Sequence, residues 1–371
     1  MRVRVPDILA GVVRDNPDYP LALTTAVTAL ADAIRSDALL MPLALPCPDE
    51  AEWAGSIDGA TWLQSEWFPA ECYVYRCLMS VVRYWETGRD PFAPAKRREL
   101  SEDELWTFID RALEVARSDP ETRVSTLLGF ALWGNRVDLS YAVGAAFGAH
   151  GAAADLLVDD RDFAVPLLLS PGGDIHLVAD NTGRELAADL ILADALMSLS
   201  SARISLHVKM HPMFVSDATA SDVWDLISAM SARGGPARDL AARLTRGFDD
   251  ERLRILPDFF WNGPRFLWDR PLRLARELDR ATIVVLKGDA NYRRAVGDAI
   301  WPAASTFSDA TDYFPAPLLC LRTMKSDALV GVSQERTSAT DHADAKWRIN
   351  GRRGLIQGRP AKSGRPQDQE R

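Results

Sequence analysis

Apolar side chains in the N-terminal part of the chain recur at helical spacing. Residues 21–40 place them three and four positions apart, and residues 51–86, which are rich in Trp and Tyr, also favour helix. Ser101 is followed three residues later by Glu104, ahead of a periodic apolar run, which is the pattern of a helix that starts with a capping box. We therefore predict a mostly helical N-terminal domain over residues 1–158.

Further along the chain, the apolar positions form short runs that end in polar or charged residues, as buried strands do. The runs cover residues 163–169, 175–180, 204–209, 281–289 and 317–322. Helix-like segments lie between them at residues 183–198, 220–233 and 271–279. Residues 234–270 look irregular and rich in aromatic residues, and we predict a loop with short helices there. The alternation predicts an α/β fold, a three-layer sandwich with a mostly parallel sheet over residues 159–333, preceded by the helical domain.

The last part of the chain has few apolar residues. From Ser333 onward Gly, Arg, Pro and Gln dominate, and such a segment buries too little apolar surface to offset its ordering entropy. We predict that residues 334–371 form a disordered basic tail. The whole chain carries a net charge of −9, so the part that precedes this basic tail is strongly acidic. That balance argues against nucleic acid or an anionic membrane as a partner of the folded body.

Composition sets further limits on the class of protein. The chain has 371 residues, of which 47% are hydrophobic, enough for the core of one large or two ordinary domains. Its four cysteines show no metal-ligand spacing, so we expect reduced thiols in a cytoplasmic protein. We expect neither a signal peptide nor a membrane span, because no uninterrupted apolar run reaches ~18 residues. The oligomeric state stays open.

Polar side chains follow four of the predicted strands, and the carboxyl ends of parallel strands meet at one edge of a sheet. They are Asp180 and Asn181, His207 and Lys209, Lys287 and Asp289, and Arg322 and Lys325. Asp180 and Asn181 are hard oxygen donors for Mg²⁺ or Mn²⁺, and Asp217 is the best candidate for a further carboxylate. Lys287, Arg322 and Lys325 are candidates to clamp phosphate oxygens.

Local structure is the competing explanation for these residues. An Asp-Asn pair after a strand is more often a turn or a helix cap, and Lys-Gly-Asp is usually a turn. His207 and His211 stand four residues apart, as in zinc helices, but the catalytic Glu is missing and Pro212 follows. We reject the zinc site and keep His207 as a residue that contacts substrate. Glycine-rich dinucleotide and P-loop motifs are missing from the sequence.

Five segments, in order, make the chain resemble the damage-control phosphatase family. They read ADNTGRELAADLILAD, HVKxxPxFVSDAT, PDFFWNGPRFLW, KGDANYRRAVGD and PLLCLRTMKSD, where x is any residue. Within the family they are similar to subfamily III, the acidic-residue methyltransferase-like branch, which is marked by an Arg-Thr-x-Lys motif that here begins at Arg322. TWLxxEWxxAECYxYR and WGNRVDLS are similar to the same branch, so the resemblance spans residues 20–333.

The resemblance implies a metal-dependent phosphatase of sugar phosphates and related phosphometabolites. It assigns Asp180, Asn181 and Asp217 as metal ligands and catalytic residues, with Mn²⁺, Co²⁺, Ni²⁺ or Mg²⁺ as the ion. Residues 289–293 and Lys325 match its substrate-binding positions. Together with the polar residues at the strand ends, the expected substrate-binding set is Glu185, His207, Lys209, Lys287, Asp289, Asn291, Arg293, Arg322 and Lys325.

The chain departs from the usual family form at Thr182 and Ala290, but neither change removes a ligand oxygen or a charged group, so we expect activity to survive. The expected mechanism uses the ion to bind a phosphoryl oxygen and to activate a water molecule, while basic side chains hold the remaining oxygens. A fructose 1-phosphate-like substrate fits the branch.

Two alternatives stay open. One is a protein carboxyl methyltransferase that uses S-adenosylmethionine, because Glu185 matches a position assigned to that cofactor. The other is a sugar-phosphate sensor without catalytic activity.

Overall fold

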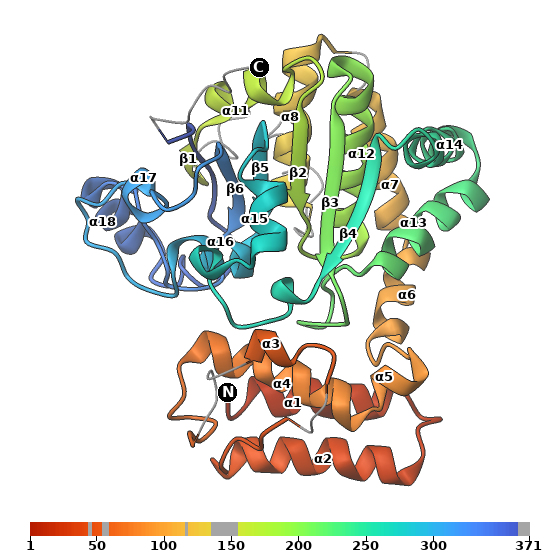
Figure 1. Cartoon of the computed structure of the whole chain (residues 1–371), viewed down its shortest axis with the longest axis vertical. Helices are drawn as coiled ribbons and strands as arrows, with labels where there is room; N and C mark the ends of the chain where they lie inside the picture. The colour runs from red at the N-terminus through yellow and green to blue at the C-terminus, as the bar shows by residue number, and fades with distance from the viewer. Residues whose placement is uncertain (44–46, 54–58, 116–117, 135–154, 363–371) are drawn as a thin grey trace. The chain divides into compact units, whose positions relative to one another are not determined.

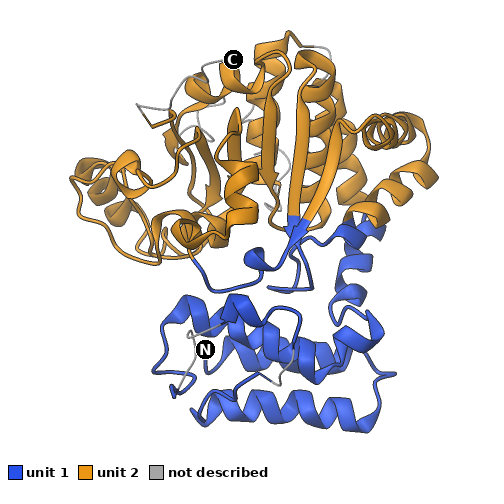
Figure 2. Ribbon diagram, in the orientation of Figure 1, with its two compact units in different colours: residues 1–102, 208–222, 257–265 blue, residues 103–207, 223–256, 266–371 orange. Residues whose placement is uncertain are grey.

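The computed structural model describes residues 1–43, 47–53, 59–115, 118–134 and 155–362, which form two units (Figures 1 and 2). Unit 1 comprises residues 1–102, 208–222 and 257–265, and unit 2 comprises residues 103–207, 223–256 and 266–371. The chain passes from unit 2 into unit 1 near the ends of strands β3 and β4. The two units do not divide at the predicted boundary of residue 158, because the described residues 103–115, 118–134 and 155–158 are grouped with the α/β unit.

Unit 1 is mainly helical, which confirms the helical character predicted for its N-terminal part. Its helices are α1 (Arg4–Asp15), α2 (Leu21–Arg35), α3 (Glu50–Trp53), α4 (Trp67–Val81), α5 (Tyr84–Thr87) and α6 (Ala93–Ser101). It also holds the 3-10 helix η2 (Phe259–Trp261). The side chains of α4 are buried over most of its length, which makes this helix the core of the unit.

The predicted capping box is wrong. Ser101 is the last residue of α6, and its hydroxyl donates to the carbonyl oxygen of Arg98 at 2.7 Å. The next helix, α7 (Asp103–Glu114), begins two residues later with Glu104 in its first turn. The spacing of Ser101 and Glu104 arises because one helix ends where the next begins, and sequence spacing alone does not separate that case from a cap.

Unit 2 is built on a seven-stranded sheet in the order β1-β7-β6-β5-β2-β3-β4. The strands are β1 (Leu156–Asp159), β2 (Asp174–Val178), β3 (Arg203–Lys209), β4 (Leu253–Asp258), β5 (Ile283–Lys287), β6 (Leu318–Thr323) and β7 (Gly354–Arg359). The pairs β1–β7, β2–β3, β2–β5 and β5–β6 are parallel, and β6–β7 is antiparallel. This mostly parallel sheet confirms the predicted α/β fold.

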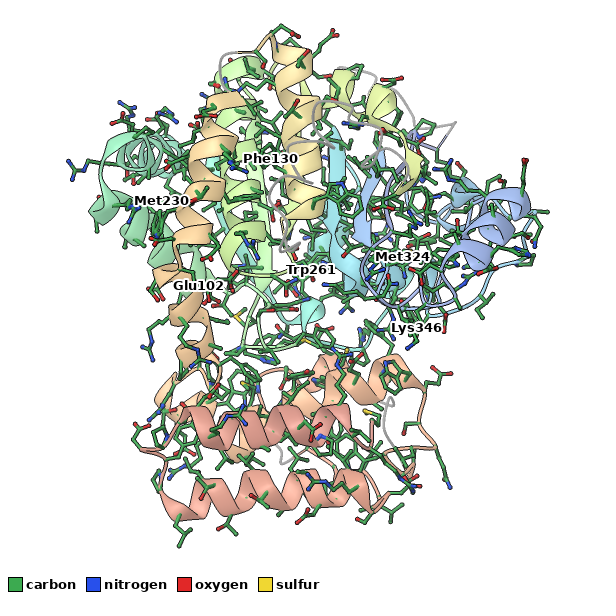
Figure 3. The ribbon with its side chains drawn as sticks, turned by 180° about the vertical axis from the view of Figure 1, so that it is seen from behind. Glu102, Phe130, Met230, Trp261, Met324 and Lys346 are labelled. Carbon is green, nitrogen blue, oxygen red and sulfur yellow. The ribbon has the colours of Figure 1, made fainter. Side chains whose placement is uncertain are left out.

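Helices cover both faces of the sheet. In Figure 1 α15 (Leu272–Leu278) and α16 (Gly288–Val296) lie in front of it, and Figure 3 shows α7 and α8 (Pro120–Trp133) on the opposite side, with Phe130 on α8. α12 (Gly183–Ser200) packs against α8 and is buried on nearly every side, as its apolar composition requires. The other helices of this part of the chain are α11 (Arg161–Leu168), α13 (Ala220–Arg233), α14 (Gly235–Asp249), η3 (Leu267–Asp269), α17 (Phe307–Ala310) and α18 (Gln334–Ala343).

Two predicted segments have a different structure. Residues 163–169 lie almost wholly in helix α11, with Pro166 inside it, because a short apolar run has no periodicity that separates strand from helix. Residues 234–270, predicted to be a loop with short helices, contain the short helices η2 and η3 but also all of helix α14 and all of strand β4.

The predicted disordered tail is also wrong over its described part. Residues 334–343 form α18, and β7 lies in the interior of the sheet between β1 and β6, with Leu355 and Ile356 fully buried. The glycines of this strand permit close packing, since a Cβ at Gly354 would meet the ring of Trp133. Residues 363–371 lie outside the described residues, as do residues 135–140 of the WGNRVDLS segment.

Across the described ranges, none of the helices combines the length and the apolar character that crossing a membrane requires.

Candidate functional site

The carboxyl ends of β2, β5 and β6 lie at one edge of the sheet in unit 2, because these strands are parallel neighbours. Asp180 follows β2 and Lys287 ends β5, while Arg322 lies next to the end of β6. Helix α12 begins a few residues after β2 and helix α16 begins directly after β5, so their N-termini face the same edge. This edge is the candidate site.

Asp180, Asn181 and Glu185 form a hydrogen-bonded group in which both acidic residues are buried and Asn181 is half-buried. Asn181 Nδ2 lies 3.0 Å from Asp180 Oδ2 and 2.9 Å from Glu185 Oε1. Ionised carboxylates only accept hydrogen bonds, so the amide nitrogen must face both of them. The Asn181 Oδ1 atom is therefore turned to the other side of the amide, and Glu185 fixes that orientation.

Gly288 makes room for the Asp180 carboxylate. The backbone of Gly288 has φ of +85°, and a Cβ atom at this position would overlap the carboxylate. Asp180 thus lies against the start of α16, where the helix dipole favours a negative charge. Asn291 joins the two strand ends, since its Nδ2 donates to the carbonyl oxygens of Lys287 at 2.8 Å and Ala179 at 3.3 Å.

Lys287 is committed to an ion pair with Asp189 of α12. The Lys287 Nζ and Asp189 Oδ1 atoms are 2.5 Å apart, and both side chains are almost fully buried. Burial raises the pKa of Asp189 to about 6. Burial alone would lower the pKa of Lys287, but the attraction of Asp189 outweighs it and the net direction is upward, so the ammonium stays charged. The pair ties α12 to β5 directly beneath the edge that carries Asp180.

Arg322 organises the loop after β6. Its Nε donates to Asp289 Oδ1 at 2.7 Å, and its Nη2 donates to the Oγ and the carbonyl oxygen of Ser326, each at 2.9 Å. Asp289 Oδ1 also accepts from the backbone N–H of Lys325 at 3.2 Å. Burial alone would raise the pKa of Asp289, but the neighbouring guanidinium groups, chiefly Arg322, lower it overall. The exposed Lys325 side chain is thus presented on a loop whose backbone is fixed.

Two other predicted residues each contact a partner that was not predicted. Arg293 pairs with Asp298, with Nε 2.7 Å from Oδ1. His207 is fully buried within the sheet, where its Nε2 lies 2.8 Å from Nδ1 of His176 on the neighbouring strand. Burial, together with His176, lowers the pKa of His207 well below its usual range, so its ring is neutral near pH 7.

Unit 1 contains a second group of predicted residues. Lys209 Nζ lies 3.4 Å from Asp217 Oδ2 and donates to the carbonyl oxygen of Trp261 at 2.7 Å, with Lys209 and Asp217 both buried. Lys96 donates to the carbonyl oxygen of Asp217 at 3.1 Å. Two lysines therefore surround one buried acidic residue.

The donor chemistry suits a hard divalent cation. Across the described ranges, no three or more His, Cys, Asp or Glu side chains are arranged to hold a metal ion. Asp180 and Asn181 nevertheless supply a carboxylate and an amide oxygen from adjacent positions in the chain, and hard cations prefer oxygen donors of these kinds. Asp217 is a carboxylate of the same kind.

Sequence reasoning missed three residues that shape the site: Asp189, Gly288 and Ser326. Asp189 stands four positions after Glu185 on α12, so both side chains lie on one face of that helix, and this spacing was the available signal. Gly288 and Ser326 have no sequence feature of their own that marks them as site residues. Only their position next to the predicted residues Lys287 and Lys325 could have pointed to them.

Comparisons with known proteins agree along most of the chain. Residues 4–340 match the family model described as "Damage-control phosphatase ARMT1-like domain". Proteins named damage-control phosphatase ARMT1 are similar to the chain: the Danio rerio protein is 29% identical, covering 80% of this chain and 74% of that protein. The Xenopus tropicalis protein is 27% identical, covering 88% of this chain and 84% of that protein. The Homo sapiens protein is also 27% identical, covering 80% of this chain and 75% of that protein.

Among solved structures, a DUF89 family protein from Pyrococcus horikoshii superposes with a TM-score of 0.52, covering 96% of both chains at 14% sequence identity. At that level of identity the similarity concerns the fold.

Proposed function

Because the chain belongs to the ARMT1-like family of damage-control phosphatases, we propose that it is a divalent-metal-dependent hydrolase of phosphomonoesters. We propose a small, fructose 1-phosphate-like sugar phosphate or a related phosphometabolite as its substrate. The observation that carries the proposal is the Asp180–Asn181 pair, whose carboxylate lies on Gly288 and whose amide is oriented by Glu185. This arrangement presents two oxygen donors of the kind that hard cations prefer.

We assign Asp180, Asn181 and Asp217 to hold the ion, which is Mn²⁺, Co²⁺, Ni²⁺ or Mg²⁺. When bound, the ion supplies positive charge that neutralises phosphoryl oxygens and lowers the pKa of water. The assignment of Asp217 rests on the family resemblance of its segment. Its contact with Lys209 is consistent with the assignment, because it gives the buried carboxylate a partner of opposite charge.

The basic residues divide into two roles in this proposal. Lys325, which is exposed, contacts the phosphate of the substrate, while Lys287 and Arg322 act as positioning residues through their partners Asp189 and Asp289. In the reaction a water oxygen forms a bond to phosphorus as the ester P–O bond breaks. The departing sugar oxygen takes up a proton, which gives the free sugar and inorganic phosphate.

Metal-dependent phosphate release tests the proposal. The substrates are p-nitrophenyl phosphate and a panel of sugar phosphates that includes fructose 1-phosphate, each measured with the four metals and after chelation. We expect turnover that requires metal and disappears in Asp180→Asn. The matched control is Asp110→Asn, the same substitution on the exposed surface of α7, which should retain full activity.

The outcomes also separate the alternatives. Binding of the sugar phosphate without phosphate release under any of the four metals would support the sensor. Transfer of labelled methyl groups from S-adenosylmethionine to protein carboxylates would support the methyltransferase. In the structure Glu185, the residue matched to that cofactor, accepts a hydrogen bond from Asn181.

We also propose a cytoplasmic location. The cysteines Cys47, Cys72, Cys77 and Cys320 are free thiols, as is usual in a reducing compartment. Cell fractionation tests this directly.

A further inference from the structure

A strained turn precedes Asp217 in unit 1. Phe214 and Val215 both have a left-handed backbone, with φ of 46° and 74°. A β-branched residue in this region is an outlier, because its Cβ crowds the adjacent carbonyl oxygen. Such conformations persist only where surrounding contacts impose them, and they cluster where a functional group needs a fixed geometry.

Contacts on both sides of the turn hold it in place. The ring of Phe214 meets the ring of Tyr75 edge-on, with the ring centroids 5.0 Å apart. The ring centroid of Tyr75 in turn lies 6.1 Å from that of Phe92. Tyr75 and Phe92 are buried in unit 1, so Phe214 is packed against a rigid wall. The backbone N–H of Asp217 donates to the carbonyl oxygen of Met213 at 3.1 Å, which closes the turn on itself.

Two lysines fix the residue that leaves the turn. Lys96 donates to the backbone carbonyl oxygen of Asp217 and is itself anchored by Asp90 and Asp222, at 2.9 and 2.8 Å. Lys209 contacts the Asp217 carboxylate at 3.4 Å. The backbone and the side chain of Asp217 are therefore held by different ammonium groups, those of Lys96 and Lys209. The strained turn before Asp217 determines how the residue is oriented toward these two groups.

We propose that Phe214 and Val215 form a positioning element, which holds the Asp217 carboxylate in the orientation that binds the metal ion. This inference rests on the proposed function, because it takes Asp217 to be a metal ligand. Neither residue is assigned a contact with ion or substrate. A carboxylate that is already fixed loses little freedom when it binds, so the strained turn favours metal binding.

Replacing Val215 by glycine tests the proposal, because glycine adopts a left-handed backbone without steric cost and also leaves the turn free to move. We expect the Kd for Mn²⁺, measured by titration calorimetry, to rise roughly tenfold in Val215→Gly. The midpoint of thermal unfolding of the metal-free protein should change little, because the substitution relieves backbone strain. A structural role alone would change that midpoint and leave the Kd unchanged.

Two further variants keep the test decisive. Val215→Asn also tolerates a left-handed backbone but lacks the stiff β-branched side chain of valine, so the turn is less restricted and Mn²⁺ binding should weaken even if the glycine variant does not fold. Glu251→Gly is the matched control: Glu251 is exposed, has φ of 55° and lies outside unit 1, so its Kd should match that of the unaltered protein.

Asp217→Asn separates the two levels of the argument. If it binds Mn²⁺ as tightly as the unaltered protein, Asp217 is not a ligand, and the positioning role is overturned with that part of the proposed function. If it loses binding while both folded Val215 variants bind normally, Asp217 remains a ligand and only the positioning role is overturned.

Discussion

The Asp180 carboxylate lies so close to Gly288 that a single added Cβ atom would overlap it. The two residues follow neighbouring parallel strands, β2 and β5, so the contact joins the two strand ends at the candidate site. Glycine is required there twice over: for the space that the carboxylate occupies and for a backbone φ of +85°.

Gly288→Ala should abolish most of the phosphatase activity. The new methyl group displaces the Asp180 carboxylate, and a shift of about 1 Å at a catalytic group costs on the order of 100-fold in rate. Steady-state phosphate release measures the effect. Gly235→Ala is the control, because Gly235 also has a left-handed backbone, with φ of +56°, but a Cβ there meets nothing within 4 Å. It should lose about 1 kcal/mol of stability and no activity; equal activity losses in both variants would contradict the explanation.

Glu185→Ala should weaken metal binding by releasing the Asn181 amide. Loss of a group that orients a metal ligand costs roughly 10- to 100-fold in affinity. Glu185→Gln keeps an acceptor oxygen at the same position and should retain most of the affinity. Calorimetric titration with Mn²⁺ compares the variants. If Glu185→Gln fails as badly as Glu185→Ala, the negative charge of Glu185 matters more than its hydrogen bond.

Much of the sheet was predictable from the sequence, and the reason is local. The runs at β2, β3, β5 and β6 are apolar, end in polar residues and are buried in neighbouring parallel strands, so their pattern survives without tertiary information. β7 lacked such a pattern: its Leu355 and Ile356 are flanked by Gly354 and Gln357, and only the partners β1 and β6 make it a strand.

The candidate site divides in the same way. Asp180 and Asn181 were found because they directly follow a strand. The partner of Lys287 was not, because pairing with Asp189 depends on how α12 packs against β5, and a lone acidic residue in a helix carries no mark of that contact. Charge alone therefore suggested a phosphate clamp where the structure has an ion pair.

The Lys287–Asp189 pair provides a test of that distinction. Lys287→Met leaves a buried carboxylate without its partner and should cost about 3–5 kcal/mol in the free energy of unfolding. The double variant Lys287→Met/Asp189→Leu removes both charges and should recover most of the loss, as followed by urea denaturation. If Lys287 acts only through Asp189, the refolded double variant should also recover substrate affinity. A stable double variant with a greatly raised KM would instead show that Lys287 contacts the phosphate.

Stability should fall in acid partly because of His211 in unit 1. Burial lowers the pKa of His211 from 6.5 to about 4. Below pH 6.5 the unfolded chain therefore binds a proton that the folded chain rejects, and His211 destabilises the fold by up to about 3 kcal/mol as the pH approaches 4. Urea denaturation between pH about 7 and about 4.5 measures the slope. His211→Gln should flatten it, whereas His342→Gln, at an exposed position of α18, should leave it unchanged.

Two isoleucines in the C-terminal segment test whether β7 is part of the core. Ile356 is fully buried in β7, between β6 and β1, whereas Ile349 lies 57% exposed a few residues earlier. Ile356→Ala removes buried methyl groups and leaves a cavity, which should cost about 2–5 kcal/mol in the free energy of unfolding. Ile349→Ala makes the same chemical change at the surface and should cost less than about 0.5 kcal/mol.

Urea denaturation of the two variants, compared with the unaltered protein, gives both values. A disordered tail, as the composition of the segment predicts, would make both substitutions silent. A loss confined to Ile356→Ala would show that a strand that begins with Gly and ends with Arg completes the sheet, because its backbone pairs with β1 and β6 while Leu355 and Ile356, on opposite faces of the sheet, are buried.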